Sequence, residues 1–305
     1  MPTIAAPTRI KLHNILFATD FSSAEQAGLP HAIDLARRYG GVLYTAHVLP
    51  HWQFFEAAQT NPEEARLLVN QQMHDLTSSA SFRDVEHKEL IEQGEVAEEL
   101  LKLVHKHAID LIVIGTGGRT GPGKMLLGSV AESVFRNAEC PVLTIGPHAT
   151  RWGIDGNLRH ILFATDFRRE SLRALPYALS LAEENRARLT LWYASQFPLT
   201  LPEFRPEDPR ERLTYWKNRL RALIPKETQL WHEPEYLVQF GTHPGEMIVK
   251  FAEQSVDMIV LGAKRKRPTV WTKHLGAGVA YKVVCEAPCP VLTVGAARHL
   301  RFAPR

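Results

Sequence analysis

The chain has 305 residues, of which 45% are hydrophobic and 23% charged, as is typical of a globular protein with a substantial core. Its formal net charge of +3 is too small to indicate nucleic acid or a membrane surface as a partner, and no apolar run approaches the roughly 18 residues of a membrane span. Three cysteines and an N-terminus without the apolar stretch of a signal peptide predict a cytoplasmic protein, and the length predicts about two domains.

Three short motifs occur in both halves of the chain at almost constant spacing. They are NILFATDF, IDLIVIG and CPVLTIG, beginning at Asn14, Ile109 and Cys140, and HILFATDF, VDMIVLG and CPVLTVG, beginning at His160, Val256 and Cys289. A repeat of this length is a whole domain rather than a solenoid unit. We therefore expect two tandem domains, residues 1–148 and 156–305, joined through the glycine-containing segment Gly146–Leu158.

Apolar strands alternate with helices along the first repeat. The expected strands are Ile15–Ala18, Val42–Leu49, Val85–Gln93, Leu111–Ile114 and Val142–Ile145. The expected helices are Ser22–Tyr39, Pro62–Ala80, Glu95–Ala108 and Gly128–Asn137. This order predicts an α/β fold in which a parallel, doubly wound sheet is covered on both faces. Ligands of such sheets bind at the carboxyl ends of the strands, where the strand order reverses.

Local signals set the limits of the first helix. Ser22 and Glu25 have the spacing of a capping box, and the pair Gly40-Gly41 is a typical helix stop. Pro30 lies inside the expected helix, and Pro176 lies at the matching place in the second repeat. We therefore expect a similar kink in both helices.

The segment after the expected fourth strand, Gly115–Ser133, is rich in glycine. Such a backbone lets N–H groups approach an anion closely, and the helix that starts at Gly128-Ser129 would favour a phosphate. Ser129 and Glu132 also have the spacing of a capping box, so a flexible loop before an ordinarily capped helix is the alternative. The segment contains no Walker A motif, and the first strand is not followed by a Rossmann glycine fingerprint.

The spacing Gly115-x2-Gly118-x9-Gly128-Ser129 resembles the glycine pattern of the ATP-binding universal stress proteins. Asp20 after the first strand and Ala46-His47-Val48 at the end of the second are similar to that family as well. The resemblance covers nearly the whole chain. It implies two Rossmann-like domains with the strand order 3-2-1-4-5, paired about a pseudo-twofold axis, and ATP bound in a cleft with Mg²⁺ held through its phosphates.

The resemblance also implies which residues would contact the nucleotide. Asp20 would bind the ribose or the adenine, Ala18 and Thr19 would line the base, and the Val48 backbone would read the adenine edge. The phosphates and ribose would be wrapped by Gly115, Thr116, Gly118, Arg119, Gly128, Ser129 and Val130. A cap on the following helix is the structural alternative for Asp20, and the two roles are compatible.

The second repeat keeps Asp166 but loses the glycine pattern. Arg265 stands in the place of Gly118, and Ala277 replaces Ser129. We therefore expect one ATP site, in the N-terminal domain, and a structural C-terminal domain. The basic run Lys264–Arg267 has three interpretations, namely a solvated loop, a site for an anionic ligand, or a surface for an acidic partner.

Three functions are compatible with this sequence. The first is a nucleotide-dependent regulator of a stress response, which acts through a protein partner and for which homodimerisation is a further option. The second is a slow ATPase or phosphate-transferring enzyme, for which His47 and Lys124 are the titratable candidates near the loop, although neither is an evident general base. The third is an interaction module that needs no nucleotide. We assign no catalytic residues and expect no metal ligands on the protein itself.

Overall fold

The structure is a computed structural model that describes residues 9–22, 27–50, 62–116, 127–149, 157–195, 208–263, 278–295 and 302–303. These residues form two compact units. One unit contains Lys11–Pro147 and the other contains His148–Val294, which also takes in Arg9–Ile10 and residues 302–303. Each unit therefore holds one of the two repeats.

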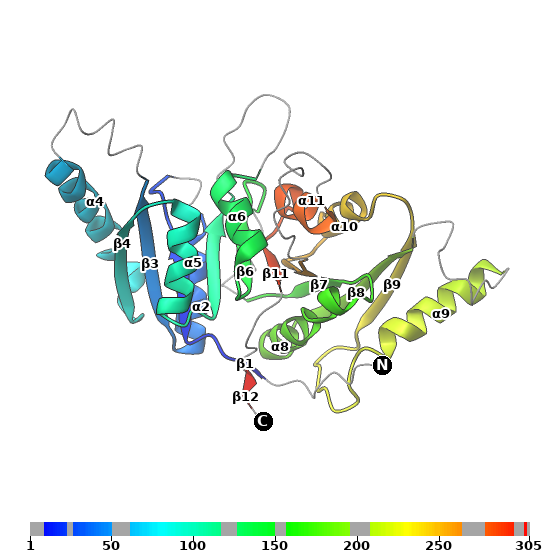
Figure 1. Ribbon diagram of the computed structural model, residues 1–305. Helices are drawn as coiled ribbons and strands as arrows, with labels where there is room; N and C mark the ends of the chain where they lie inside the picture. The colour runs from blue at the N-terminus through cyan, green and yellow to red at the C-terminus, as the bar shows by residue number, and fades with distance from the viewer. Residues whose placement is uncertain are drawn as a thin grey trace. The chain divides into compact units, whose positions relative to one another are not determined.

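The first unit is built on a five-stranded parallel sheet (Figure 1). Its strands are β2 (Asn14–Ala18), β3 (Val42–Leu49), β4 (His87–Gln93), β5 (Leu111–Gly115) and β6 (Val142–Ile145). They lie in the order β4-β3-β2-β5-β6, which confirms the predicted order 3-2-1-4-5. The central strands are buried along their length because helices cover both faces of the sheet.

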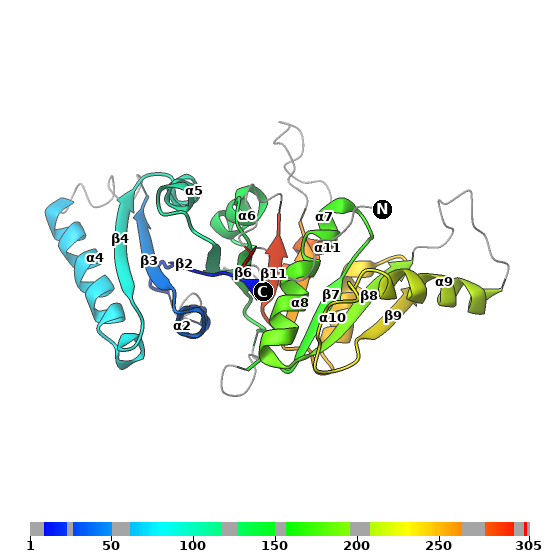
Figure 2. The ribbon, with the colours of Figure 1, turned by 90° about the horizontal axis from the view of Figure 1, so that it is seen from below.

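Four helices of the first unit surround this sheet. They are α2 (Leu29–Tyr39), α4 (Pro62–Thr77), α5 (Val96–Lys106) and α6 (Ser129–Asn137), with a short 3₁₀ turn at Ala80–Phe82. Figure 2 shows α5 and α6 on one face of the sheet and α2 on the other. Each of these three helices buries an apolar stripe against the strands, as the 3.6-residue periodicity predicted for α2 and α5.

The helix predicted over Ser22–Tyr39 is present as α2, but its predicted start at Ser22 and its kink are wrong. Residues 27–28 form a turn, and α2 begins at Leu29 with Gly28 as its N-cap. Pro30 therefore lies in the first helical turn, where a proline costs no hydrogen bond and causes no kink. Pro176 has the same place in the second repeat. Gly40 ends α2 in the left-handed conformation, with φ at 58°, which confirms the predicted stop.

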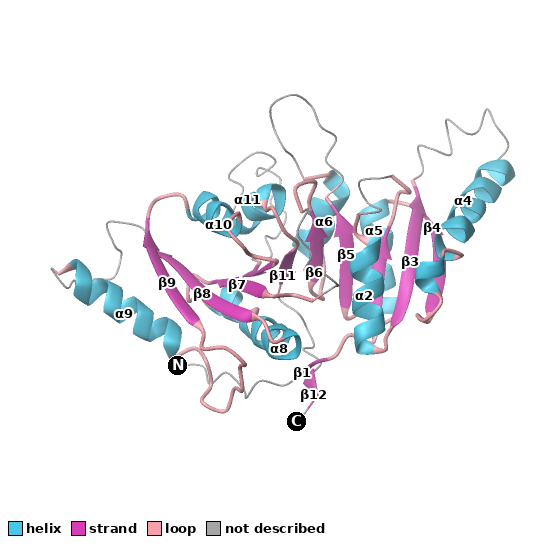
Figure 3. Cartoon of the chain, turned by 180° about the vertical axis from the view of Figure 1, so that it is seen from behind, coloured by secondary structure: helices cyan, strands magenta, loops and turns pink. Residues whose placement is uncertain are grey.

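The second unit repeats the same sheet (Figure 3). Its strands are β7 (His160–Ala164), β8 (Arg188–Ser195), β9 (Glu235–Phe240), β10 (Met258–Gly262) and β11 (Val291–Val294), all parallel and in the order β9-β8-β7-β10-β11. Its helices are α7 (Arg169–Leu172), α8 (Leu175–Asn185), α9 (Pro209–Arg221), α10 (Pro244–Ala252) and α11 (Val279–Glu286). None of the helices in the described part of the chain is long and apolar enough to cross a membrane.

A short strand from the start of the chain also belongs to the second unit. Strand β1 (Arg9–Ile10) pairs antiparallel with β12 (Phe302–Ala303) and packs against α8. The Ile10 N–H donates to Ser180 Oγ at 2.9 Å, and the Arg9 guanidinium lies 3.5 Å from the Glu184 carboxylate. The domain limits 1–148 and 156–305 stay a prediction.

Candidate functional site

The carboxyl ends of three neighbouring strands define the candidate site in the first repeat. Ala18 of β2 pairs with Ala46 of β3 on one side and with Ile114 of β5 on the other. Thr116 follows β5 directly and Asp20 lies two residues after the end of β2, so both are at the same edge of the sheet. This edge is the point where the strand order reverses, because the chain leaves β2 toward β3 and returns to the other side at β5.

A hydrogen-bonded turn presents Asp20 at this edge. The Thr19 N–H donates to the Ala46 carbonyl at 2.9 Å, and Thr19 Oγ1 accepts from the Phe21 N–H at 3.0 Å. The Ser22 N–H then donates to Asp20 Oδ1 at 2.7 Å, while the Asp20 side chain stays exposed to solvent. Phe21 has a φ of 62°, a left-handed conformation that costs a non-glycine residue energy. The alternative role of Asp20, a cap on the following helix, is not seen at α2, whose N-cap is Gly28.

His47 holds this turn against strand β3. Its Nδ1 lies 2.9 Å from the Thr19 carbonyl oxygen, and because a carbonyl only accepts, Nδ1 carries the proton. The imidazole stacks on Phe21 with ring centroids 4.6 Å apart and an angle of 27° between the planes. Burial lowers the pKa of His47 from its usual 6.5, against the opposing effects of the Thr19 hydrogen bond and the Asp20 charge. A neutral imidazole engaged in this way positions the turn, and Val48 follows it as a buried residue.

The junction of β5 and α6 forms the other side of the site. The Thr116 N–H donates to the Ile145 carbonyl at 3.0 Å, and its own carbonyl accepts from the Gly128 N–H at 3.1 Å. The second bond brings the N-terminus of α6 beside the end of β5. The first N–H groups of a helix have no partner within the helix, so they suit an anion such as a phosphate.

The capping box predicted at Ser129 and Glu132 is wrong. Gly128 is the N-cap of α6, Ser129 is the first helical residue, and no side chain among the described residues caps this helix. The Glu132 carboxylate instead accepts from the Arg136 guanidinium, with an Nη2–Oε1 distance of 2.7 Å. The exposed Ser129 side chain thus lies at an uncapped helix start.

The structure describes nine of the eleven predicted ligand residues. These are Ala18, Thr19, Asp20, Val48, Gly115, Thr116, Gly128, Ser129 and Val130, and all lie on β2, β3, β5, α6 or the turns beside them. Gly118 and Arg119 lie outside the described residues, as do Lys124 and the basic run Lys264–Arg267. The sequence interpretation missed Phe21 as a member of the site, although its recurrence after Asp166 was a signal. The ligand roles of all eleven residues stay predictions.

The matching turn in the second repeat is held differently. Asp166 Oδ1 accepts from the Ser171 hydroxyl at 2.7 Å and from the Arg168 N–H at 3.0 Å. Ser171 lies in the short helix α7, and Gly262 at the end of β10 packs so closely against the backbone of Glu170 and Ser171 that a Cβ would collide with it. Asp166 therefore serves the local structure of the turn.

An aromatic cluster covers the same edge in the second repeat. Phe167, at a φ of 60°, has its ring centroid 4.8 Å from that of Tyr193 and 5.5 Å from that of Trp216. The Arg219 guanidinium lies over Phe167 at 4.5 Å. Tyr193 occupies the place that His47 has in the first repeat, and Trp216 comes from α9. The second edge is therefore filled by the protein's own side chains and by α7.

The three cysteines carry no disulfide. Cys140, Cys285 and Cys289 are free and buried. Burial raises the pKa of Cys140 to about 12, which keeps its thiol protonated and unreactive at neutral pH. These residues therefore act as small core side chains.

Fold and site together define a tandem α/β protein of two doubly wound domains. In each domain an exposed aspartate follows the first strand, and α6 or α11 starts without a side-chain cap among the described residues. The chain belongs to the universal stress protein family, whose sequence model matches residues 11–146 and 157–295. A universal stress protein of Methanocaldococcus jannaschii is 33% identical over 137 residues, which are 43% of this chain and 80% of the relative. A Staphylococcus aureus relative is 30% identical over 147 residues, 45% of this chain and 85% of its own length.

A solved structure shares the fold over nearly the whole chain. The crystal structure of a universal stress protein from Archaeoglobus fulgidus matches 93% of this chain and 98% of its own chain, with a TM-score of 0.63. The sequences are 19% identical, so this likeness concerns the fold.

Proposed function

We propose that the first repeat binds ATP, with Mg²⁺ held through its phosphates, and that the protein is a nucleotide-dependent regulator of a stress response. The observation that carries the proposal is the position of the exposed Asp20 carboxylate, at the strand-order reversal and on the same edge as the uncapped start of α6. A carboxylate suits ribose hydroxyls, and free helical N–H groups suit phosphates. The described residues therefore fit the two polar ends of a nucleotide.

The remaining predicted ligands extend this arrangement. In the proposal Ala18 and Thr19 line the base, and the backbone of Val48 reads the adenine edge. The phosphates and ribose lie against Gly115, Thr116, Gly118, Arg119, Gly128, Ser129 and Val130. Mg²⁺ supplies charge neutralisation between phosphate oxygens, so it needs few ligands from the protein.

Regulation fits the site better than hydrolysis does. The imidazole of His47 is bound through Nδ1 to the Thr19 carbonyl and stacked on Phe21, so it is engaged in structure. The nucleotide would act by its different affinity for two states of the protein, which a partner then distinguishes. Three free cysteines suit a reducing cytoplasm, and self-association is part of the same proposal.

The test is a calorimetric titration of ATP with Mg²⁺ into the protein and two matched variants. Asp20→Ala removes the carboxylate of the proposed site, and Asp166→Ala removes its counterpart in the second repeat. We expect one site per chain, an affinity at least about tenfold weaker in Asp20→Ala, and an unchanged affinity in Asp166→Ala. Chemical denaturation of each variant checks that it is folded.

Two results contradict the proposal. Two equivalent sites, or a loss of binding confined to Asp166→Ala, would place nucleotide in the second repeat. The absence of any binding by the folded protein would favour the interaction module that needs no nucleotide.

A further inference from the structure

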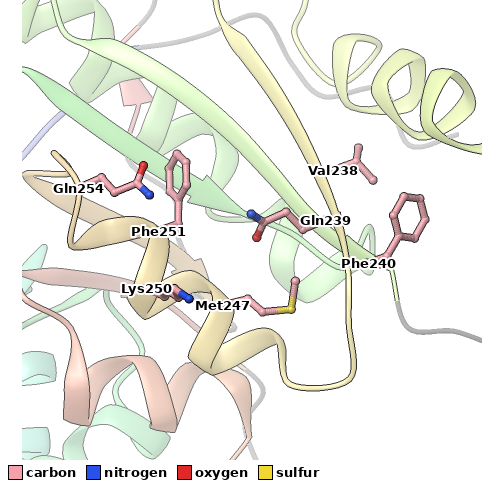
Figure 4. A pocket seen from close by; sticks show the side chains of 7 residues that line it. All are labelled: Val238, Gln239, Phe240, Met247, Lys250, Phe251 and Gln254. Atoms are coloured by element: carbon pink, nitrogen blue, oxygen red, sulfur yellow. The ribbon is translucent and has the colours of Figure 1, made fainter. Parts of the chain in front are cut away.

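A pocket of about 390 Å³ lies in the second repeat between β9 and α10 (Figure 4). Gln239 of β9 lines it from one side. Met247, Lys250 and Phe251 of α10, with Gln254 just beyond the helix, line it from the other. The volume falls within the range of roughly 300–1,000 Å³ that small-molecule sites occupy. None of these residues belongs to the nucleotide site proposed for the first repeat.

The polar groups of this pocket are suited to an anion. Figure 4 shows the Gln239 side chain reaching from β9 toward α10. Its Oε1 accepts from Trp192 Nε1 at 3.1 Å, which leaves the two amide N–H donors for a ligand. Lys250 brings a positive charge, and within the described residues it forms no ion pair. Among the described residues that line the pocket, none carries a carboxylate.

The apolar part of the pocket comes from α10. Met247 and Phe251 are four residues apart, so they lie one above the other on the same side of the helix. Figure 4 shows both side chains directed into the space that faces β9. Gly241, in the turn after β9, has no Cβ, and a Cβ there would meet the Met247 sulfur at 2.6 Å. A thioether and an aromatic ring together make a surface for a flat apolar group.

At the sequence positions that match the pocket residues of α10, the helix of the first repeat carries aliphatic side chains. Residues 147 positions earlier in the chain are Leu100, Leu103 and Val104, which match Met247, Lys250 and Phe251. They are 1%, 1% and 5% exposed and belong to the core of their repeat. The core-facing residues of α10 are instead Gly245, Ile248, Val249 and Ala252, so Met247, Lys250 and Phe251 lie beside the buried stripe of this helix and line the pocket.

We propose that this pocket binds a small carboxylic acid with an aromatic or other flat apolar body. The carboxylate lies between the Lys250 ammonium and the Gln239 amide, and the apolar body lies against Met247 and Phe251. One ammonium and one amide match the charge and size of a carboxylate, whose two oxygens accept from both donors. The second repeat then has a ligand of its own, and the proposal is independent of ATP in the first repeat.

The experiment uses 2-naphthoate as the probe in fluorescence titrations of the full-length protein. We expect saturable binding at one site per chain, and binding of the neutral 2-naphthamide at least about tenfold weaker. Lys250→Met removes the charge from an exposed helix position without affecting the core, and it should weaken 2-naphthoate about tenfold. Lys217→Met makes the same change on the exposed face of α9 and should leave the affinity unchanged.

Three outcomes would overturn the proposal. The first is no saturable binding up to millimolar probe, and the second is an equal effect of Lys250→Met and Lys217→Met. The third is displacement of the probe by ATP with Mg²⁺, which would place it in the other site. Binding that persists with saturating ATP and depends on Lys250 supports the proposal, whether or not the protein binds ATP at all.

Discussion

The two repeats carry the same five residues, Phe-Ala-Thr-Asp-Phe, at the end of their first strands, and they fold them into the same turn with the phenylalanine in a left-handed conformation. Both aspartates are exposed, and in the first repeat Phe21 stacks on the imidazole of His47. In the second, Phe167 lies in a cluster with Tyr193 and Trp216. The motif therefore determines the conformation of the turn. Residues elsewhere in the chain determine whether side chains cover the carboxyl end of the sheet beside this turn.

The role of the aspartate in each turn also depends on the residues around it. Asp166 accepts a hydrogen bond from the Ser171 hydroxyl of α7, which packs against Gly262 at the end of β10. A carboxylate engaged in this way contributes to the local fold. In the second repeat Asp166 therefore contributes to the local fold, and the single nucleotide site stays a prediction.

Removal of Trp216 is the largest expected perturbation of the filled edge. Trp216→Ala deletes a ring that is 5% exposed and touches Phe167 and Tyr193, so the free energy of unfolding should fall by about 3–5 kcal/mol. Chemical denaturation of the full-length protein measures it. Trp231→Ala is the matched control, because that ring is 60% exposed and lies over Arg186, and it should cost about 1 kcal/mol or less. Equal losses in the two variants would refute the packing role of Trp216.

His31 distinguishes the repeats in their response to pH. Burial in α2 lowers its pKa from 6.5 to about 4, while the matching residue of α8 is the equally buried Tyr177. As the pH falls, His31 is protonated in the unfolded chain at a higher pH than in the folded protein. The contribution of neutral His31 to the free energy of unfolding is therefore complete above pH 6.5 and is lost as the pH falls toward 4. The difference between the pKa of His31 in the unfolded and the folded protein corresponds to about 3 kcal/mol in the free energy of unfolding.

His31→Tyr gives the first repeat the residue of the second and should remove that part of the pH dependence. Denaturation curves at several pH values between 6.5 and 4 test this. His74→Tyr, on the exposed face of α4, is the control and should follow the parent protein. A His31→Tyr variant that loses as much stability on acidification as the parent would contradict the prediction.

The Gly262→Ala variant tests whether α7 packs tightly against the end of β10 in the second repeat. The substitution directs a Cβ into the backbone of Glu170 and Ser171, so either α7 or β10 must shift. We expect a loss of about 1–3 kcal/mol in the free energy of unfolding, measured by denaturation, and no change in ATP binding. Gly278→Ala, where a Cβ meets no atom within 4 Å, should cost less than about 1 kcal/mol. Similar stabilities of the two variants would show that the end of β10 is not tightly closed.

The sequence predicted the strands better than the start of α2. The limits of β3 and β6, Val42–Leu49 and Val142–Ile145, match the prediction because a strand buried on both faces is a continuous apolar run with abrupt ends. The start of α2 was missed because Pro30 was interpreted as an interior proline, whereas a first-turn proline marks a beginning.

In the candidate site, too, local features were predicted from the sequence and contacts between separate elements were not. Asp20 and Gly128 were predicted from motifs in which each residue has a role in its own local segment. Phe167 and Trp216 belong to separate elements, and no local sequence pattern predicts that their rings are in contact. The pocket beside α10 was also missed, since it depends on what the strand opposite the helix leaves open.

The short strand β1 has a consequence for how the chain is made. The Ile10 N–H finds its acceptor, Ser180 Oγ, 170 residues further along, and Ile10 pairs with residue 302 of β12. The hydrogen bond of Ile10 can therefore form only once Ser180 has been synthesised, and its pairing with β12 only once residue 302 has been synthesised. Closure over so long a loop comes late in folding. A truncated polypeptide would keep this apolar residue in water, which distinguishes an unfinished molecule from a finished one.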